Sequence, residues 1–107
     1  MFCASVAYPL DSVDFDVDYF RDRHAPLFAE MLGATCVRYE VHRGLVAPGA
    51  PRPPFIAAAY FWVRSAQAFG AALAEHAAEI YADIDSFSTT QPVRAWAEVS
   101  TYREAQP

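Results

Sequence analysis

Four separate stretches of the chain have the pattern of β-strands: in two of them hydrophobic and polar residues alternate, and the other two are mostly apolar. The first stretch is closed by Pro9, a residue that cannot continue an inner strand. Between the second and third stretches the sequence GLVAPGAPRPP places four prolines and two glycines in eleven residues, which predicts a stiff connection. The four predicted strands are residues 2–8 (FCASVAY), 35–43 (TCVRYEVHR), 55–63 (FIAAAYFWV) and 93–102 (VRAWAEVSTY).

The second and third predicted strands differ in what their two faces carry. The second alternates strictly, with one face formed by Val37, Tyr39 and Val41 and the other by Cys36, Arg38, Glu40 and His42. The third is apolar on both faces, as is usual for a strand buried from both sides. One of its faces carries Ile56, Ala58, Tyr60 and Trp62.

Two further stretches repeat their apolar residues every three to four positions, which predicts two helices. Asp14 or Asp16 can cap the first helix, and Gly33 is expected to end it. Its apolar stripe comprises Val17, Phe20, His24, Leu27, Phe28 and Met31. Ser65 can cap the second helix, whose stripe comprises Phe69, Leu73, Ala77, Ile80 and Ile84.

The predicted order is strand, helix, strand, strand, helix, strand, which is the ferredoxin-like βαββαβ unit of the α+β class. We expect a four-stranded antiparallel sheet in one domain over residues 1–107, with a polar tail from about 103. Two helices cover only one face of such a sheet, so the apolar residues on its other face need another partner. A homodimer formed through the open sheet face is the economical solution.

Composition narrows the class of protein. The chain has 107 residues, 54% of them apolar, and a formal net charge of −5, which disfavours nucleic acid or an anionic membrane as partner. The apolar N-terminal stretch lacks a basic region, so we expect no signal peptide and a cytoplasmic location. Cys3 and Cys36 lie far apart without metal-ligand spacing; we expect small buried residues, with a disulfide or metal site as the alternative.

His24 is the first candidate catalytic residue. It lies on the apolar stripe of the first helix, two residues before Pro26, which interrupts the helical hydrogen bonds. Burial disfavours the charged imidazolium and lowers its pKa, so the ring would be mostly neutral at pH 7 and suited to accept a proton. The alternative is a core histidine bonded to a backbone carbonyl, for which Pro26 leaves the carbonyl of Asp22 available.

Asp83 and the tyrosines are the remaining candidates. Asp83 falls at the end of the second helix, where the helix dipole disfavours a carboxylate, so it either orients His24 or caps the next turn. A tyrosine can donate a hydrogen bond to a substrate carbonyl while its ring lines an apolar pocket. We expect the pocket to be lined by Tyr8, Tyr39, Phe20, Phe28 and Phe87 and the dimer face to carry Tyr60 and Trp62.

Three segments resemble the EthD-like family. YPLDSVDFDVDYFRDRHAPLFAEMLG resembles its opening block, with a Tyr-Pro strand end, an Asp-Tyr helix start, and His-x-Pro-Leu before a glycine. APGAPRPPF resembles its Pro-Gly-rich connection into the third strand. AFGAALAEHAAEIYADIDSFSTTQP resembles its closing helix, with an aspartate, a phenylalanine, a hydroxyl residue and then a proline. The resemblance covers residues 6–99 in order.

This resemblance implies a dimeric α+β barrel, in which two ferredoxin-like sheets pack face to face. It also implies a relation to proteins linked with bacterial ether degradation. Relatives with the same barrel include cofactor-free monooxygenases, polyketide cyclases, lactone isomerases, decarboxylases and haem proteins. One fold therefore supports many activities, and the function has to be argued from the site.

The sequence thus predicts a small homodimeric protein that binds an apolar, aromatic or polyketide-like compound. The first hypothesis is cofactor-independent acid–base catalysis of a cyclisation, isomerisation, decarboxylation or oxygenation. His24 would be the base, Asp83 its orienting partner or acid, and a tyrosine the donor to a substrate carbonyl, with no metal. Neither GxGxxG nor GxSxG occurs, which disfavours a nucleotide loop or a serine nucleophile. Two alternatives stay open: a non-catalytic binding or accessory protein of an oxidative degradation system, and a haem protein with His24 as axial ligand.

Overall fold

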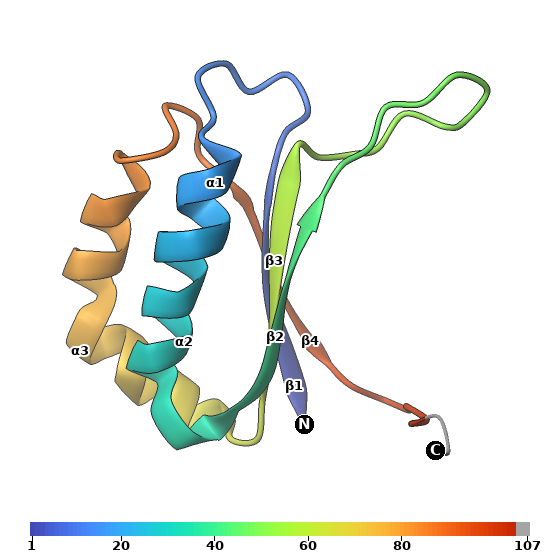
Figure 1. Cartoon of the computed structure of the whole chain (residues 1–107). Coiled ribbons are helices and arrows are strands. Elements are labelled where there is room, and N and C mark those ends of the chain that lie inside the picture. The colour runs from blue at the N-terminus through green and yellow to red at the C-terminus, as the bar shows by residue number, and fades with distance from the viewer. Residues whose placement is uncertain (105–107) are drawn as a thin grey trace.

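The computed structural model describes residues 1–104 and contains one four-stranded antiparallel sheet with the strand order β2-β3-β1-β4 (Figure 1). β1 pairs with β3 on one side and with β4 on the other, and β2 pairs only with β3. The strands are β1 (Phe2–Tyr8), β2 (Cys36–Arg43), β3 (Ala57–Val63) and β4 (Val93–Glu98). The third and fourth strands are thus shorter than predicted, and the predicted polar tail lies partly outside the described residues.

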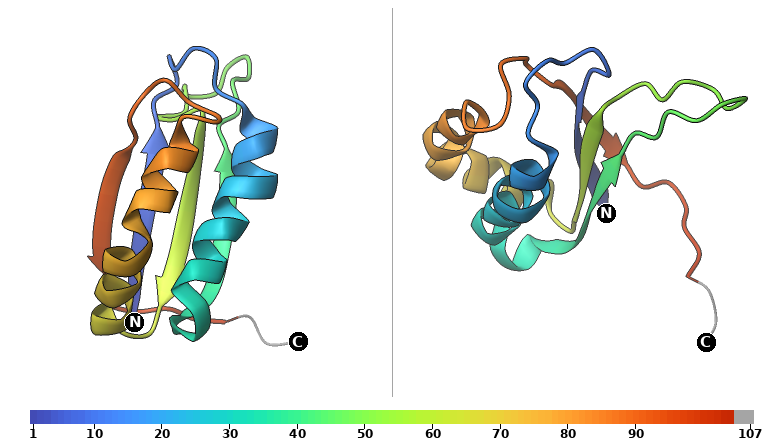
Figure 2. Two further views of the ribbon diagram at one scale, coloured as in Figure 1. Left: turned by 90° about the vertical axis from the view of Figure 1, so that its left-hand side faces the viewer. Right: turned by 45° about the horizontal axis from the view of Figure 1, so that its top comes forward.

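Two helical segments lie side by side in one layer over one face of this sheet (Figure 2). The first is a continuous helical stretch followed by a 3₁₀ turn, and the second is a single long helix. The elements are α1 (Val17–Tyr19), the π-helical segment η1 (Phe20–His24), α2 (Ala25–Leu32), the 3₁₀ turn η2 (Gly33–Thr35) and α3 (Ala66–Ile84). The predicted ferredoxin-like α+β fold is confirmed.

The helix ends follow the predicted capping chemistry. The Asp16 side chain accepts a hydrogen bond from the backbone N–H of Tyr19 at 3.0 Å, and Ser65 accepts one from that of Ala68 at 3.1 Å. Each bond satisfies a backbone donor that has no partner inside its helix. Gly33 ends α2 with φ of 66°, a backbone conformation that residues other than glycine rarely adopt. The predicted starts and stops are therefore confirmed.

The π-helical segment corrects the predicted apolar stripe of the first helix. Its wider turn is closed by a hydrogen bond from the backbone N–H of Ala25 to the carbonyl of Phe20, five residues back. Pro26 then stands in the first turn of α2, where its missing N–H costs little. Because a π turn adds one residue to the helix, the residues that reach the core after it are Phe28 and Leu32. The prediction is therefore confirmed for Phe28 and wrong for Leu27 and Met31, in place of which Leu32 reaches the core.

Strand register assigns the two faces of the sheet. Tyr60 and Trp62 of β3 pair with Ser5 and Cys3 of β1. They alternate with Ala59 and Phe61, which line the cavity under the helices, and so lie on the face without helices. The prediction that these aromatic residues leave the helix-covered face is confirmed. In β2, the register shifts between Cys36 and Arg38, so the two residues pair on opposite faces and the predicted strict alternation fails there. Both cysteines are free and partly buried.

No helix within residues 1–104 is long and apolar enough to cross a lipid bilayer.

Candidate functional site

A cavity of about 290 Å³ lies between the sheet and the helices. Its walls are mostly apolar and come from both layers, so the fold itself builds the site. Residues of the sheet that line it include Val6, Tyr8, Phe61 and Trp96, and residues of the helices include Phe20, His24, Phe28, Phe69 and Ile80. An apolar cavity of roughly 150 Å³ can hold a benzene molecule, so this one has room for one or two aromatic rings.

His24 lies in the wall of the cavity with only 6% of its surface exposed. Its Nδ1 is 2.8 Å from Oδ2 of Asp83, and its ring packs against that of Phe87 with the centroids 4.6 Å apart. Burial lowers the pKa of His24 below its ordinary value, and the hydrogen bond and charge of Asp83 offset part of that effect. The structure therefore pairs His24 with a carboxylate, and not with a backbone carbonyl.

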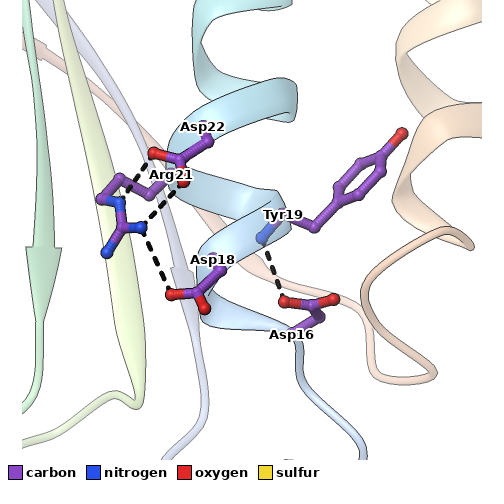
Figure 3. A network of polar contacts seen from close by, with 5 residues as sticks. All are labelled: Asp16, Asp18, Tyr19, Arg21 and Asp22. Carbon is purple, nitrogen blue, oxygen red and sulfur yellow. Dashed lines mark hydrogen bonds and ion pairs between the residues drawn. The ribbon is translucent and has the colours of Figure 1, made fainter.

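Asp83 connects the two helical segments. It lies in the last turn of α3, and its Oδ1 accepts a hydrogen bond of 2.7 Å from the Tyr19 hydroxyl while Oδ2 bonds His24. Figure 3 shows the ring of Tyr19 extending from the first helix toward α3. The helix dipole disfavours a carboxylate at this end of a helix, and two donors from the neighbouring helix compensate. The Asp83 side chain thus holds His24 and does not cap the following turn.

This arrangement fixes the role of each His24 nitrogen. A carboxylate accepts hydrogen bonds, so the proton of the neutral ring belongs on Nδ1, and Nε2 carries the lone pair. Nε2 has no hydrogen-bond partner within residues 1–104. In that part of the chain every fully buried side-chain nitrogen or oxygen has a partner, so Nε2 is not fully buried. Nε2 is therefore accessible from the cavity. A base oriented by a carboxylate behind it is a common arrangement in proton-transfer sites.

Tyr8 brings a second polar group to the cavity. Its side chain is 1% exposed, and its hydroxyl makes no hydrogen bond within the described part of the chain. Burial raises the pKa of Tyr8 well above its usual range, and the positive charge of Arg94 opposes that shift. The hydroxyl is therefore protonated at neutral pH and can donate a hydrogen bond to a ligand.

Three of the five aromatic residues that were expected to line the pocket do so, and two do not. Phe20 and Phe28 line it together with Tyr8. Phe87 lies behind His24 in the aromatic core and is 2% exposed. Tyr39 stacks on Phe61 with a centroid distance of 5.7 Å, is 39% exposed and does not line the cavity.

Sequence reasoning missed most of the apolar wall of the cavity and, beyond it, three residues of the polar network and of β4. Tyr19 was considered as a tyrosine but not as a partner of Asp83, which lies 64 positions away. Arg94 and Trp96 of β4 line the cavity because they pair with Val6 and Ala4 on the helix-covered face. Alternation in β4 indicated that these two share a face, but only the pairing with β1 says which face it is.

The fold and the cavity define a small ferredoxin-like α+β protein with a histidine–carboxylate pair at the edge of an apolar cavity. The chain belongs to the EthD family: the family model described as the EthD domain matches residues 9–91. That match includes Tyr19, His24 and Asp83. No match was found among curated proteins.

Solved structures agree with the family assignment. An EthD-like protein from Ralstonia eutropha JMP134 is similar, with 38% identity, a TM-score of 0.84, and coverage of 95% of this chain and 94% of that one. An ethyl tert-butyl ether D (EthD) family protein from Bacillus halodurans C-125 has 12% identity, a TM-score of 0.67 and coverage of 91% and 95%. HapK from Hahella chejuensis has 17% identity, a TM-score of 0.60 and coverage of 98% and 100%. The last two likenesses concern the fold alone.

Proposed function

We propose that this protein is a cofactor-independent acid–base enzyme whose substrate is a small apolar, aromatic or polyketide-like compound. The observation that carries the proposal is the His24–Asp83 pair: a buried imidazole with Nδ1 held by a carboxylate and Nε2 open to an apolar cavity. A neutral imidazole fixed in this way is prepared to accept a proton at neutral pH.

The proton transfer follows from the positions of these groups. His24 Nε2 takes a proton from an acidic carbon or phenol of the substrate, and the electron pair left behind moves onto a neighbouring oxygen. Asp83 stabilises the imidazolium that forms, because its carboxylate already bonds Nδ1 at 2.8 Å. Return of the proton to a different atom completes an isomerisation. For a cyclisation, the carbanion first attacks a carbonyl carbon of the same substrate, and the proton goes to the oxygen of that carbonyl. For a decarboxylation, His24 first takes the proton of a carboxylic acid, CO₂ leaves, and the imidazolium returns that proton to the carbon.

The active form is proposed to be a homodimer that packs through the face of the sheet without helices. Tyr60 and Trp62 remain partly exposed on that face. The loop of residues 44–56 and residues 99–104 after β4 both extend on the same side (Figure 1), where a second copy would contact them. Analytical ultracentrifugation tests this assembly: Trp62→Arg is expected to give monomers, and Val13→Arg, in an exposed loop, to leave the dimer intact. A monomeric wild-type protein contradicts the proposed assembly.

The catalytic proposal can be tested without knowing the natural substrate. The probe 5-nitrobenzisoxazole is a small apolar heteroaromatic; when a base removes its C3 proton, the N–O bond breaks and a coloured 2-cyano-4-nitrophenolate forms. We expect turnover that His24→Gln lowers by about 100-fold or more, the usual contribution of a general base. The rate should increase with pH through the lowered pKa of His24 and level off near neutrality.

A control separates catalysis from binding. Titration with neutral 2-acetylnaphthalene measures whether the cavity still accepts an aromatic ligand in His24→Gln. Retained binding with lost turnover supports His24 as the base. Equal turnover in the wild type and in His24→Gln, or binding by the wild type without any turnover, overturns the proposal and favours a binding or accessory protein.

A further inference from the structure

Arg94 lies on β4, an edge strand of the sheet, and on the face of that strand that the helices cover. It pairs directly with Val6 of β1, and its side chain is one of those that line the cavity. Its guanidinium lies 5.2 Å from the centroid of the Tyr81 ring, which comes from α3 across the cavity. This cation–π contact bridges the sheet and the helix layer and places a positive charge at the rim of the cavity.

The charge of Arg94 is not balanced by a neighbouring acid. No carboxylate within residues 1–104 lies within ion-pair distance of it, whereas Arg21 and Arg38 contact Asp22 and Glu40. The described residues that line the cavity include no Asp or Glu, and Arg94 is the one Arg or Lys among them. An anion that enters this cavity would therefore meet a cation without displacing an existing partner.

Tyr8 and Arg94 are placed to act on the same atoms. Both line the cavity on the same face of neighbouring strands, and Tyr8 is two residues beyond the Val6 that pairs with Arg94. Side chains at such diagonal positions in an antiparallel pair are within reach of each other when they are long or aromatic. The Tyr8 hydroxyl and the Arg94 guanidinium both donate hydrogen bonds, and a carboxylate accepts several.

We propose that Arg94 and Tyr8 select a substrate with a carboxylate, so that the compound bound beside His24 is a one- or two-ring aromatic acid. This proposal rests on the proposed function, because it names the substrate class of the same cavity. The apolar walls hold the rings, and the carboxylate is held at the rim by Arg94 and by the Tyr8 hydroxyl. Arg94 is thus a specificity-determining residue, while His24 performs the proton transfer.

The experiment compares two ligands of nearly equal shape. Isothermal titration calorimetry measures the affinity for 2-naphthoate, which is an anion, and for 2-acetylnaphthalene, which is neutral. We expect the wild type to prefer the carboxylate by about 10-fold or more, as for hydrogen bonds to charged groups. Arg94→Met should remove this preference and leave the affinity for the ketone within about twofold, because the charged contact is lost while the apolar walls remain. Arg94→Lys should keep part of the preference, because the charge remains without the planar fork.

Two controls make the outcomes distinct. Arg52→Met removes the same charge from the exposed loop and should keep the full preference, which excludes an effect of net charge alone. His24→Gln should lose turnover of 5-nitrobenzisoxazole yet keep the preference for 2-naphthoate. An unchanged preference in Arg94→Met, no preference in the wild type, or no binding of either ligand overturns the role of Arg94. If Arg94→Met loses the preference of the wild type for 2-naphthoate, but wild type and His24→Gln turn over 5-nitrobenzisoxazole equally, the role of Arg94 is supported and the proposed catalysis is overturned. The protein would then be a binder of aromatic acids.

Discussion

The helical stretch from Val17 to Leu32 carries polar networks on two of its sides, and the two differ in their surroundings. On one side Tyr19 and His24 bond to Asp83, and the His24 and Asp83 side chains are 7% and 18% exposed. On the other, Arg21 contacts Asp18 and Asp22 (Figure 3), and all three side chains are more than half exposed. Both networks have short contacts, so distance does not distinguish them.

The two networks differ in burial, and burial determines how much each one contributes to stability. A polar group that loses its partner in the interior keeps the cost of having left water, whereas an exposed group is solvated again at once. The hydrogen bond from Arg21 lowers the pKa of Asp22, but solvent screens this exposed pair and its effect on stability is correspondingly small. The buried network should therefore dominate both stability and chemistry.

Asp83→Asn should have the largest effect. An amide cannot serve both donors as a carboxylate does, so we expect a loss of about 1–3 kcal/mol in the free energy of unfolding. The pKa of His24 should decrease further, because the charge that opposed the effect of burial is gone. Urea unfolding and NMR titration of the imidazole measure the two effects. Asp85→Asn, two residues along and exposed, is the matched control; equal effects of the two variants would remove the distinction between the networks.

The pH dependence of stability should follow His24. Its pKa is lower in the folded chain than the ordinary value of 6.5, so as pH falls the unfolded chain binds the proton first. The free energy of unfolding should therefore decrease as pH falls below that value, by about 1.4 kcal/mol for each unit between the two pKa values. Thermal or urea unfolding between pH 5 and 8 measures the slope. His24→Gln should flatten it, and an equally steep profile in that variant would assign the effect to other groups.

Tyr19→Phe should have a smaller effect. It removes one hydrogen bond to Asp83 and keeps the ring that stacks on Phe87, so we expect a loss of about 0.5–1.5 kcal/mol in the free energy of unfolding. Asp83 remains bonded to His24, so the His24 titration should move less than in Asp83→Asn. A shift as large as that of Asp83→Asn would mean that Tyr19, and not the carboxylate, sets the position of the imidazole.

Arg21→Ala should have the smallest effect. Both of its acidic partners are solvated, so we expect no measurable change in the urea midpoint at physiological salt and no change in turnover. Urea unfolding repeated at low and high salt checks whether screening explains the result. A loss comparable to that of Tyr19→Phe would show that surface contacts hold this helix more firmly than their exposure indicates.

Much of the fold was predictable because its signals are local. Asp16, Ser65 and Gly33 act on backbone groups within a few residues, and strand periodicity needs only neighbouring positions. The site was predictable in part: the position of His24 on an apolar stripe suggested a buried ring, and the end of α3 is an unusual place for an unpartnered Asp83.

The rest depends on contacts that no local pattern encodes. The Tyr19–Asp83 bond joins residues 64 positions apart, and the face on which Arg94 lies depends on its pairing with β1. The apolar stripe failed at Leu27 and Met31 because its period assumes an α-helix throughout, whereas the chain inserts a π turn. Pro26 indicated that the helix is irregular near His24, but it did not predict a π turn.

That π turn has a consequence for how the family could change. The wide turn absorbs one extra residue, so deleting one residue between Phe20 and His24 would restore regular α spacing while the two halves of the helix kept their relative orientation. Phe28 would keep its contact with Phe61 at 4.6 Å, whereas the residues of the turn itself, His24 among them, would take new positions relative to Asp83. A single-codon deletion would thus change how the histidine is presented without disturbing the packing of the helix or substituting any residue of the site.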